Sequence, residues 1–276
     1  MPTVDSVLLE LDGDGVFDPR VGEAPWPILV CLLGSFRVLQ ADRALLVRGE
    51  KTVTLLGHLA LHHDEGIPRD TLRDLVWPES DAALAGESLH SRVHSLNKLL
   101  GERLGGAVPV VYVAGRYRLN SAAGVGVDVA YFDALVTAGD RQARTGHHAA
   151  AVAAYERAVA LYHGDLCVGT DVHALLERER LRARYLTLLA SLANYACGAG
   201  DDARCLEYAL CLLAGDPCRE DAHRLVMRCY VRRGERAQAL RQYRVCEAIL
   251  RTEFAASPEP ETVALFDQVR LDPRSI

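Results

Sequence analysis

Residues 86–101 of the chain, GESLHSRVHSLNKLLG, carry the most information about its fold. Leu89, Val93, Leu96 and Leu100 repeat at intervals of four, three and four residues, so they lie on one narrow face of a helix. That face has to pack into a core. Most other side chains of the stretch can form hydrogen bonds, and these are His90, Ser91, Arg92, His94, Ser95, Asn97 and Lys98. The pattern predicts a helix with one buried face and one polar face.

The segments before this helix predict strands followed by two further helices. The run ILVCLLGSFRVL from Ile28 has the short aliphatic stretches of a small antiparallel sheet, with turn points at Gly34 and at 41–42. TVTLLGHLALHH, which begins at Thr52, places its apolar residues on one helical face, and Gly66 ends this element. RDTLRDLVW then forms the second helix, which follows Pro68.

The segment after the helix predicts a β-hairpin with a basic tip. VPVVYV at 108–113 and YRL at 117–119 are separated by the turn Ala114-Gly115-Arg116. Strands, three helices and a terminal hairpin are, in this order, the elements of a winged helix.

The second half of the chain is helical and contains an internal repeat. From 127 onward the strand signals stop, and Gly146, Ala151 and Tyr155 begin a recurring spacing. The same spacing returns at Gly234, Ala239 and Tyr243 and, more loosely, at Gly200, Cys205 and Ala209. Tyr195 and Tyr230 lie 35 residues apart, close to the ~34-residue period of tetratricopeptide units. The pattern predicts stacked helix pairs in which a small residue lets two helices approach.

These segments resemble a known family of bacterial regulators. LLGSFRV, LLGHLALHH, LRDLVWPES, SLHSRVHSLNKLLG and GRYRL resemble, in this order, the OmpR-type DNA-binding domain of the SARP family. VDVAYFDAL, GDLC, LLERERLRARY and SPEPETVALFDQV resemble the bacterial transcriptional activation domain that follows it there. The resemblance implies an α+β winged helix-turn-helix domain at 27–121 and an all-α tetratricopeptide-like repeat domain at 127–272. The Gly, Pro and Asp content of residues 1–26 predicts an irregular N-terminal arm.

The resemblance also implies where DNA binds. In a winged helix the third helix lies in the major groove, so its polar face would read base edges. Arg92 or Lys98 suits guanine and Asn97 suits adenine. The hairpin residues Arg116 and Arg118 would reach the minor groove or its phosphates. Further backbone contacts are expected from Arg48, Lys51, Thr52, Arg69 and Thr71.

The implied partners are double-stranded promoter DNA with repeated half-sites and RNA polymerase holoenzyme. The net charge is −6, and residues 1–26 hold one arginine and six acidic residues, so the acidity is concentrated in the leader. Ser95 and Asn97 stand where family members carry basic residues. We therefore expect weak binding by one chain, and a homodimer or side-by-side protomers on DNA. The alternative is an adaptor or sensor without DNA binding, whose repeats bind a protein or small ligand.

Other classes of protein find little support in the sequence. It has no phosphate-binding glycine loop, no G-x-S-x-G and no H-E-x-x-H, so we expect neither an enzyme nor a cofactor. Asp12, Asp14 and Glu23 have a calcium-loop spacing, but Phe17 replaces the required glycine. The eight cysteines are scattered without zinc spacing, which predicts reduced, mostly buried thiols and no metal. Without a signal peptide or long apolar run, we expect a cytoplasmic, nucleoid-associated protein with no membrane partner.

Overall fold

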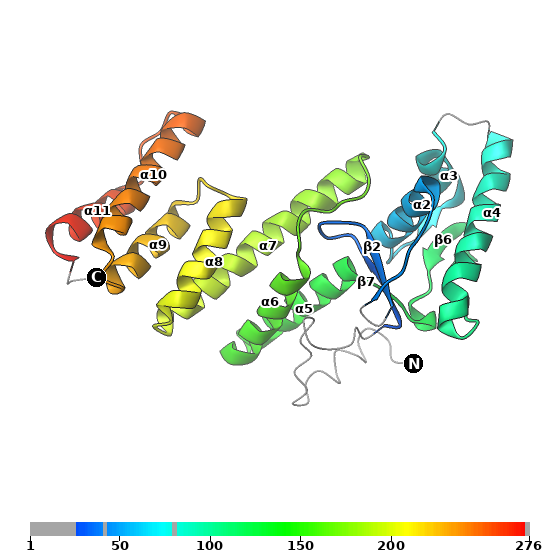
Figure 1. Cartoon of the computed structure of the whole chain (residues 1–276), viewed down its shortest axis with the longest axis horizontal. Helices are drawn as coiled ribbons and strands as arrows, with labels where there is room; N and C mark the ends of the chain where they lie inside the picture. The colour runs from blue at the N-terminus through cyan, green and yellow to red at the C-terminus, as the bar shows by residue number, and fades with distance from the viewer. Residues whose placement is uncertain (1–25, 41–42, 79–81, 274–276) are drawn as a thin grey trace. The chain divides into compact units, whose positions relative to one another are not determined.

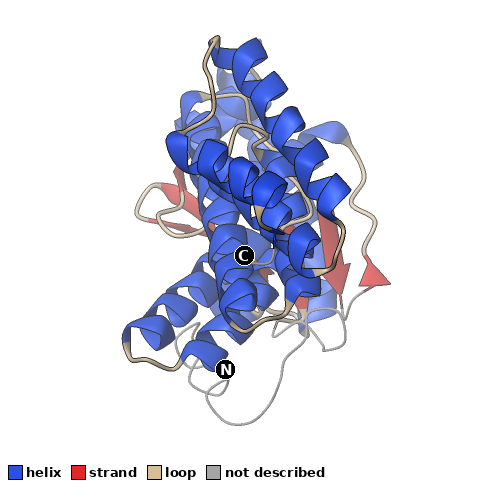
Figure 2. Ribbon diagram, turned by 90° about the vertical axis from the view of Figure 1, so that its left-hand side faces the viewer, coloured by secondary structure: helices blue, strands red, loops and turns tan. Residues whose placement is uncertain are grey.

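The computed structural model describes residues 26–40, 43–78 and 82–273. The predicted arm up to residue 25, its calcium-like spacing and the predicted turn at 41–42 lie outside the described residues. The described chain is mostly helical, with a small proportion of strand (Figure 2). It forms two compact units, one up to Leu181 and one from Arg182 onward.

The first unit contains a four-stranded sheet. Strand β1 (Ile28–Cys31) pairs antiparallel with β2 (Arg37–Gln40), which pairs in turn with β3 (Arg43–Ala44). On its other edge β1 pairs parallel with β7 (Val125–Val127). The antiparallel strands agree with the sequence analysis, which did not predict β7. Because β1 lies between two neighbours, all four of its residues are buried.

Three helices and a second sheet follow in the predicted order. Their bounds are α2 (Glu50–Leu61), β4 (Ile67–Pro68), α3 (Arg69–Val76), α4 (Ala82–Gly101), η1 (Glu102–Leu104), β5 (Val110–Val113), β6 (Arg116–Leu119) and η2 (Ser121–Ala123). Strand β6 pairs antiparallel with both β5 and β4. The apolar stripe of α4 is buried, because Leu89, Leu96 and Leu100 are 0% exposed and Val93 is 7% exposed. This confirms that α4 has a core-facing side.

The first two helices of the predicted repeat pack in the same unit as the sheet. They are α5 (Asp128–Arg144) and α6 (His148–Leu161). The carboxylate of Asp128 accepts hydrogen bonds from the backbone N–H groups of Leu32, at 2.8 and 2.9 Å, and Leu33, at 2.9 Å. Burial raises the pKa of Asp128 to about 6, although these donors oppose the shift. The start of α5 is therefore fixed to the end of β1.

The GDLC segment at 164–167 is attached to the same strand end. The N–H of Cys167 donates to the carbonyl of Leu32 at 2.9 Å, and that of Gly34 donates to the carbonyl of Asp165 at 3.0 Å. The sequence analysis placed a domain boundary between 121 and 127. The contacts of the described residues continue across it, and the predicted domain limits stay a prediction.

The second unit consists of helices arranged as the internal repeat predicts. The elements are α7 (Val172–Gly198), which contains the boundary between the units, and α8 (Asp202–Gly215), α9 (Glu220–Arg232), α10 (Arg236–Phe254) and α11 (Pro260–Leu271). The small residues Cys205, Ala209 and Ala239 are 0% exposed. Gly200 and Gly234 have φ of 75° and 78°, a left-handed conformation that favours glycine between helices. These features confirm the tetratricopeptide-like repeat.

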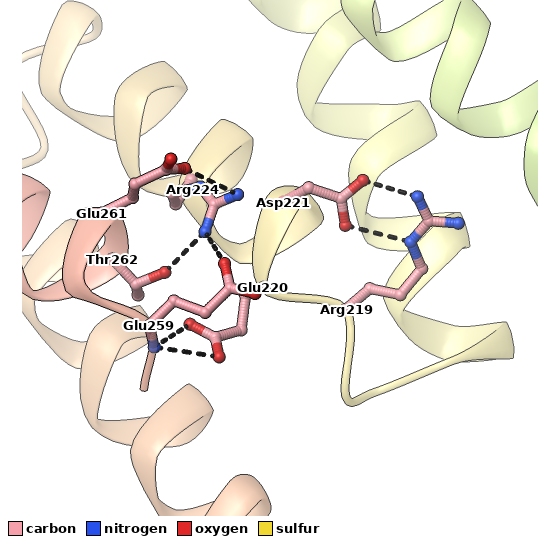
Figure 3. A network of polar contacts seen from close by, with 7 residues as sticks. All are labelled: Arg219, Glu220, Asp221, Arg224, Glu259, Glu261 and Thr262. Carbon is pink, nitrogen blue, oxygen red and sulfur yellow. Dashed lines mark hydrogen bonds and ion pairs between the residues drawn. The ribbon is translucent and has the colours of Figure 1, made fainter. Parts of the chain in front are cut away.

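A polar network joins α9 to the start of α11 (Figure 3). Arg224 Nη1 donates to Glu259 Oε2 at 2.9 Å and to Thr262 Oγ1 at 2.8 Å. The Glu220 carboxylate accepts from the backbone N–H of Glu259, at 2.8 and 3.1 Å. Because the Arg224 side chain is only 14% exposed, the network fixes α11 to the repeat.

Candidate nucleic-acid interface

The exposed side of α4 displays the polar residues that its sequence pattern predicted, with one exception. The exposed members are His90, Ser91, Arg92, His94, Ser95 and Lys98. Ser95 Oγ donates to the carbonyl of Ser91 at 3.0 Å, which leaves its oxygen as an acceptor. We call this set the α4 face. It presents two cationic side chains, two imidazoles and two hydroxyl groups to solvent.

Asn97 is the exception, because its amide is used within the protein. Its Nδ2 donates to the carbonyl of Val110 at 3.0 Å, and its Oδ1 accepts from the N–H of Val110 at 2.8 Å. Both polar groups of the amide are therefore occupied. The predicted contact of Asn97 with adenine does not fit this geometry. Asn97 instead holds β5 against α4.

The start of α3 brings two of the predicted backbone contacts close to the α4 helix and the hairpin. The N–H of Arg69 donates to the carbonyl of Gly115 at the hairpin turn, at 3.2 Å. A Cβ on Gly86 of α4 would lie 3.3 Å from Arg69 Nη2, so this guanidinium extends to α4. Thr71 is exposed in the first turn of α3, where no side chain caps the helix. Helix α3, helix α4 and strand β6 lie together in Figure 1.

Burial raises the pKa of Tyr117 on β6, and the guanidinium of Arg69 partly opposes this shift. Pro68, just before α3, pairs with Arg116 of β6, so the start of α3 also lies beside the hairpin. Tyr117 packs on Tyr112, with ring centroids 4.7 Å apart. The hairpin is thus supported from both sides, by Asn97 and by Arg69.

Gly66 fixes the position of the hairpin, which the sequence analysis missed. It has φ of 68°, and a Cβ there would lie 2.9 Å from the carbonyl oxygen of Tyr117 and 3.1 Å from Cβ of Arg118. Its own carbonyl accepts from Arg116 Nη1 at 3.0 Å. The sequence identified Gly66 only as the end of a helix, because the contact with β6 is distant in the chain. Arg116 is therefore bonded next to the hairpin turn, and both Arg116 and Arg118 are exposed.

The predicted contacts at the start of α2 fit less well. Thr52 is only 7% exposed, so its predicted phosphate contact does not fit a buried side chain. Lys51 Nζ donates to the carbonyl of Val76 at 2.8 Å and lies 5.6 Å from the ring centroid of Trp77. It stabilises the end of α3 while staying exposed. Arg48 is exposed just before α2.

The chemistry of this region suits an anionic, hydrogen-bonding partner. Arg92 and Lys98 on α4, Arg69 on α3 and Arg118 on β6 present their charges from neighbouring elements. Within the described residues, no three His, Cys, Asp or Glu side chains are placed to hold a metal ion. No helix in the described part of the chain is long and apolar enough to cross a membrane.

Comparisons with known proteins assign the family. The model of the bacterial transcriptional activator domain matches residues 127–270, more than half of the chain. No curated protein matches the sequence. Among solved structures, Mycobacterium tuberculosis EmbR in complex with a low-affinity phosphopeptide is similar with a TM-score of 0.70 and 21% identity, over 91% of this chain and 68% of that chain.

A second solved structure is the C-terminal tetratricopeptide-containing domain of a Plasmodium falciparum protein of the FK506-binding type. It has a TM-score of 0.39 and 12% identity, over 52% of this chain and 88% of that chain. The EmbR likeness shows that the two chains share a fold, a small N-terminal β region followed by helical repeats. The chain belongs to the bacterial transcriptional activator domain family and is a SARP-type transcription regulator.

Proposed function

We propose that residues 27–121 form a winged helix-turn-helix that binds double-stranded promoter DNA. The observation that carries the proposal is the division of α4 into two sides. Leu89, Leu96 and Leu100 are fully buried on one side, whereas the α4 face is polar and exposed. A helix of this kind, supported by a hairpin, has the dimensions and hydrogen-bonding groups to enter a major groove.

In this arrangement different elements have different roles. Arg92 and Lys98 would donate to guanine or to phosphate, and His90, Ser91, His94 and Ser95 would supply adaptable donors and acceptors. Arg118 would approach the minor groove from the hairpin. Arg69 and Thr71, in the first turn of α3 where no side chain caps the helix, would contact a phosphate through their side chains. Arg48 and Lys51 would contact the adjacent backbone.

The number of available cations limits the affinity of a single chain. The cations assigned to DNA above are Arg92, Lys98, Arg69, Arg118, Arg48 and Lys51. Each phosphate contact contributes about −0.9 to the slope of log affinity against log salt, so one chain should give a slope no steeper than about −5. That is a weak interaction at physiological salt. We therefore propose that two or more protomers bind repeated half-sites side by side or as a homodimer.

The family assignment supports activation as the outcome. We propose residues 27–121 as the DNA-binding domain and residues 127–272 as the domain that recruits RNA polymerase holoenzyme. Stacked helix pairs present extended surfaces that commonly bind proteins, which suits this role.

Selection from fragmented genomic DNA of the source organism, followed by DNase footprinting, tests the proposal. We expect protected sites that consist of repeated half-sites, each about one helical turn from the next. The double variant Arg92→Ala with Lys98→Ala should lose protection. Arg244→Ala, which removes an exposed charge from α10 in the second unit, is the matched control and should protect as the wild type does.

Addition of purified RNA polymerase holoenzyme to a selected promoter tests the second step. The wild-type chain should increase the run-off transcript, and the double variant should not. If no genomic fragment is enriched even at low salt while the protein remains folded, DNA binding is wrong. The adaptor or sensor alternative would then describe the chain.

A further inference from the structure

The α4 face is solvated and carries positive charge without a carboxylate to balance it. Its six members are exposed, and Arg92 and Lys98 are its permanent cations. From residue 88 to residue 101, helix α4 contains no acidic residue. Arg69 adds a guanidinium from α3, because a Cβ on Gly86 would lie 3.3 Å from its Nη2 atom. A helix face of this kind attracts a polyanion that can reach it.

The N-terminal segment of the same chain is a polyanion. Residues 1–25 hold six carboxylates and one arginine, which gives their side chains a formal charge of −5. The whole chain has a formal charge of −6, so residues 26–276 are close to neutral. We call residues 1–25 the acidic leader. Its carboxylates belong to Asp5, Glu10, Asp12, Asp14, Asp18 and Glu23.

The acidic leader joins the fold beside the residues that follow α4. Trp26 is 8% exposed, and its ring packs edge-on against Tyr131 with ring centroids 5.2 Å apart, so the junction is fixed. A Cβ on Gly124 would lie 2.9 Å from Cδ of Pro27 and 3.5 Å from Cδ2 of Leu104. Pro27 and Leu104 therefore pack on the same glycine. Leu104 is the last residue of η1, which directly follows α4.

The acidic leader is long enough to cover the whole α4 face. An α-helix rises about 1.5 Å per residue, so the face is about 12 Å long from His90 to Lys98. An extended chain spans about 3.4 Å per residue, so the leader has a reach of up to about 85 Å. Covalent attachment also places the leader at an effective concentration of about millimolar near the face. Charge, length and point of attachment thus all fit this occupant.

We propose that the acidic leader docks on the α4 face of its own chain and competes there with promoter DNA. Leader carboxylates would pair with Arg92, Lys98 and Arg69, the side chains assigned above to guanine or phosphate. The competition rests on the proposed function, whereas the docking itself needs no DNA. A leader that covers the face in about nine chains of ten lowers the apparent affinity for DNA about tenfold.

Carbodiimide cross-linking of the full-length chain without DNA tests the docking. The reagent joins a carboxylate directly to a contacting amine, and the chain contains only two lysines, Lys51 and Lys98. In the monomer fraction we expect peptide mass spectrometry to find leader carboxylates joined to Lys98. The product should disappear at about 1 M salt, where the Debye length is about 3 Å.

Lys51 is the matched internal control for this experiment. It is also exposed, but it lies on α2 with its Nζ 2.8 Å from the carbonyl of Val76, so it should give little or no product with the leader. A folded chain without leader products at Lys98 would overturn the proposal. So would products that join the leader to Lys98 of a second molecule, or equal yields at Lys51 and Lys98.

The DNA affinities of two charge-matched triple variants test the competition. One variant removes three charges from the acidic leader, by Asp12→Asn, Asp14→Asn and Asp18→Asn. The control removes three exposed charges from the second unit, by Glu207→Gln, Glu247→Gln and Glu253→Gln. At low salt we expect the leader variant to bind a selected promoter fragment about fivefold more tightly than the wild type. The control should stay within about twofold of the wild type, because its carboxylates are not tethered beside α4.

The two experiments separate failure of the competition from failure of DNA binding. Equal affinities of the two triple variants would overturn the competition, because net charge alone would then explain any gain. If none of the three proteins binds DNA at low salt, the proposed function is wrong. The yield of the Lys98 product then still decides whether the leader docks on the α4 face.

Discussion

Neighbouring residues on α4 have opposite roles. Asn97 makes two hydrogen bonds, at 3.0 and 2.8 Å, to the backbone of Val110, whereas the next side chain, Lys98, is exposed. One residue positions the hairpin and the other is available to a partner. Loss of a partner leaves buried backbone groups unsatisfied, which costs more than loss of a solvated charge.

Asn97→Ala should therefore reduce the free energy of unfolding by about 1–3 kcal/mol. Lys98→Ala should change it by less than about 0.5 kcal/mol. Thermal unfolding followed by circular dichroism measures both. Equal effects of the two substitutions would show that Asn97 does not hold the hairpin as described.

Gly66 and Gly115 both have positive φ, where a side chain strains the backbone. Only at Gly66 would a side chain also collide with neighbouring atoms. Their φ values are 68° and 80°, but a Cβ on Gly66 meets the backbone of Tyr117 at 2.9 Å, and one on Gly115 has nothing within 4 Å. Gly115→Ala should cost about 1–2 kcal/mol from the backbone alone. Gly66→Ala should cost at least about 1 kcal/mol more, because β6 must shift. Similar losses of thermal stability in the two variants would contradict this, because they would mean that β6 can shift away from a Cβ at residue 66 at no cost in free energy.

Helix α2 and the start of α7 form a pH-sensitive contact. The rings of His62 and His173 are stacked with centroids 4.3 Å apart. Burial first, and then the charges of His173 and His58, lower the pKa of His62 to about 4, while Asp171 and Glu65 oppose the shift. Burial likewise lowers the pKa of His58, with Asp171 opposing and His173 adding to the shift. The contact therefore disfavours protonation of His62.

Between pH 6.5 and about 4 the unfolded chain binds a proton at His62 that the folded chain excludes, so stability decreases as the pH falls. Asp128 changes the stability in the opposite direction. Because its pKa is raised to about 6 in the folded chain, its protonation favours the folded state as the pH falls below 6. A comparison of His62→Gln with the wild type isolates the contribution of His62 to the pH dependence of stability, because Asp128 is present in both proteins. The variant should gain about 1–2 kcal/mol relative to the wild type from pH 7 to pH 4, after allowance for solvent screening. A pH-independent difference in melting temperature would contradict this assignment.

Helix α11 depends on Arg224 for its attachment. This side chain is 14% exposed and bonds to Glu259 and Thr262, and Thr262 is itself 0% exposed. Arg224→Ala should cost about 1–3 kcal/mol by leaving these groups without a partner, and hydrogen exchange over 260–271 should accelerate. Arg233→Ala, whose ion pair with Glu235 is exposed, should leave the exchange unchanged. Unaltered exchange in both variants would show that the network does not fix α11.

Over the whole molecule, the sequence predicts what is periodic or local. The leucine and valine stripe of α4, the hairpin turn at Gly115 and the repeated glycine and alanine spacing all follow from local patterns, and the structure agrees with them. The paired strand β7 could not be predicted, because Val125–Val127 is too short for a periodic signal. The role of the Asn97 amide also needed coordinates, since its partner Val110 lies on another element.

DNA binding by the α4 face is the central claim, and its salt dependence tests it most directly. Fluorescence anisotropy with a selected promoter fragment gives log affinity against log salt for the wild type, Lys98→Ala and Arg244→Ala. We predict that Lys98→Ala weakens binding and makes the slope about 1 shallower for each bound protomer, while Arg244→Ala matches the wild type. Equal slopes for all three proteins, or no salt-sensitive binding at all, would contradict the account.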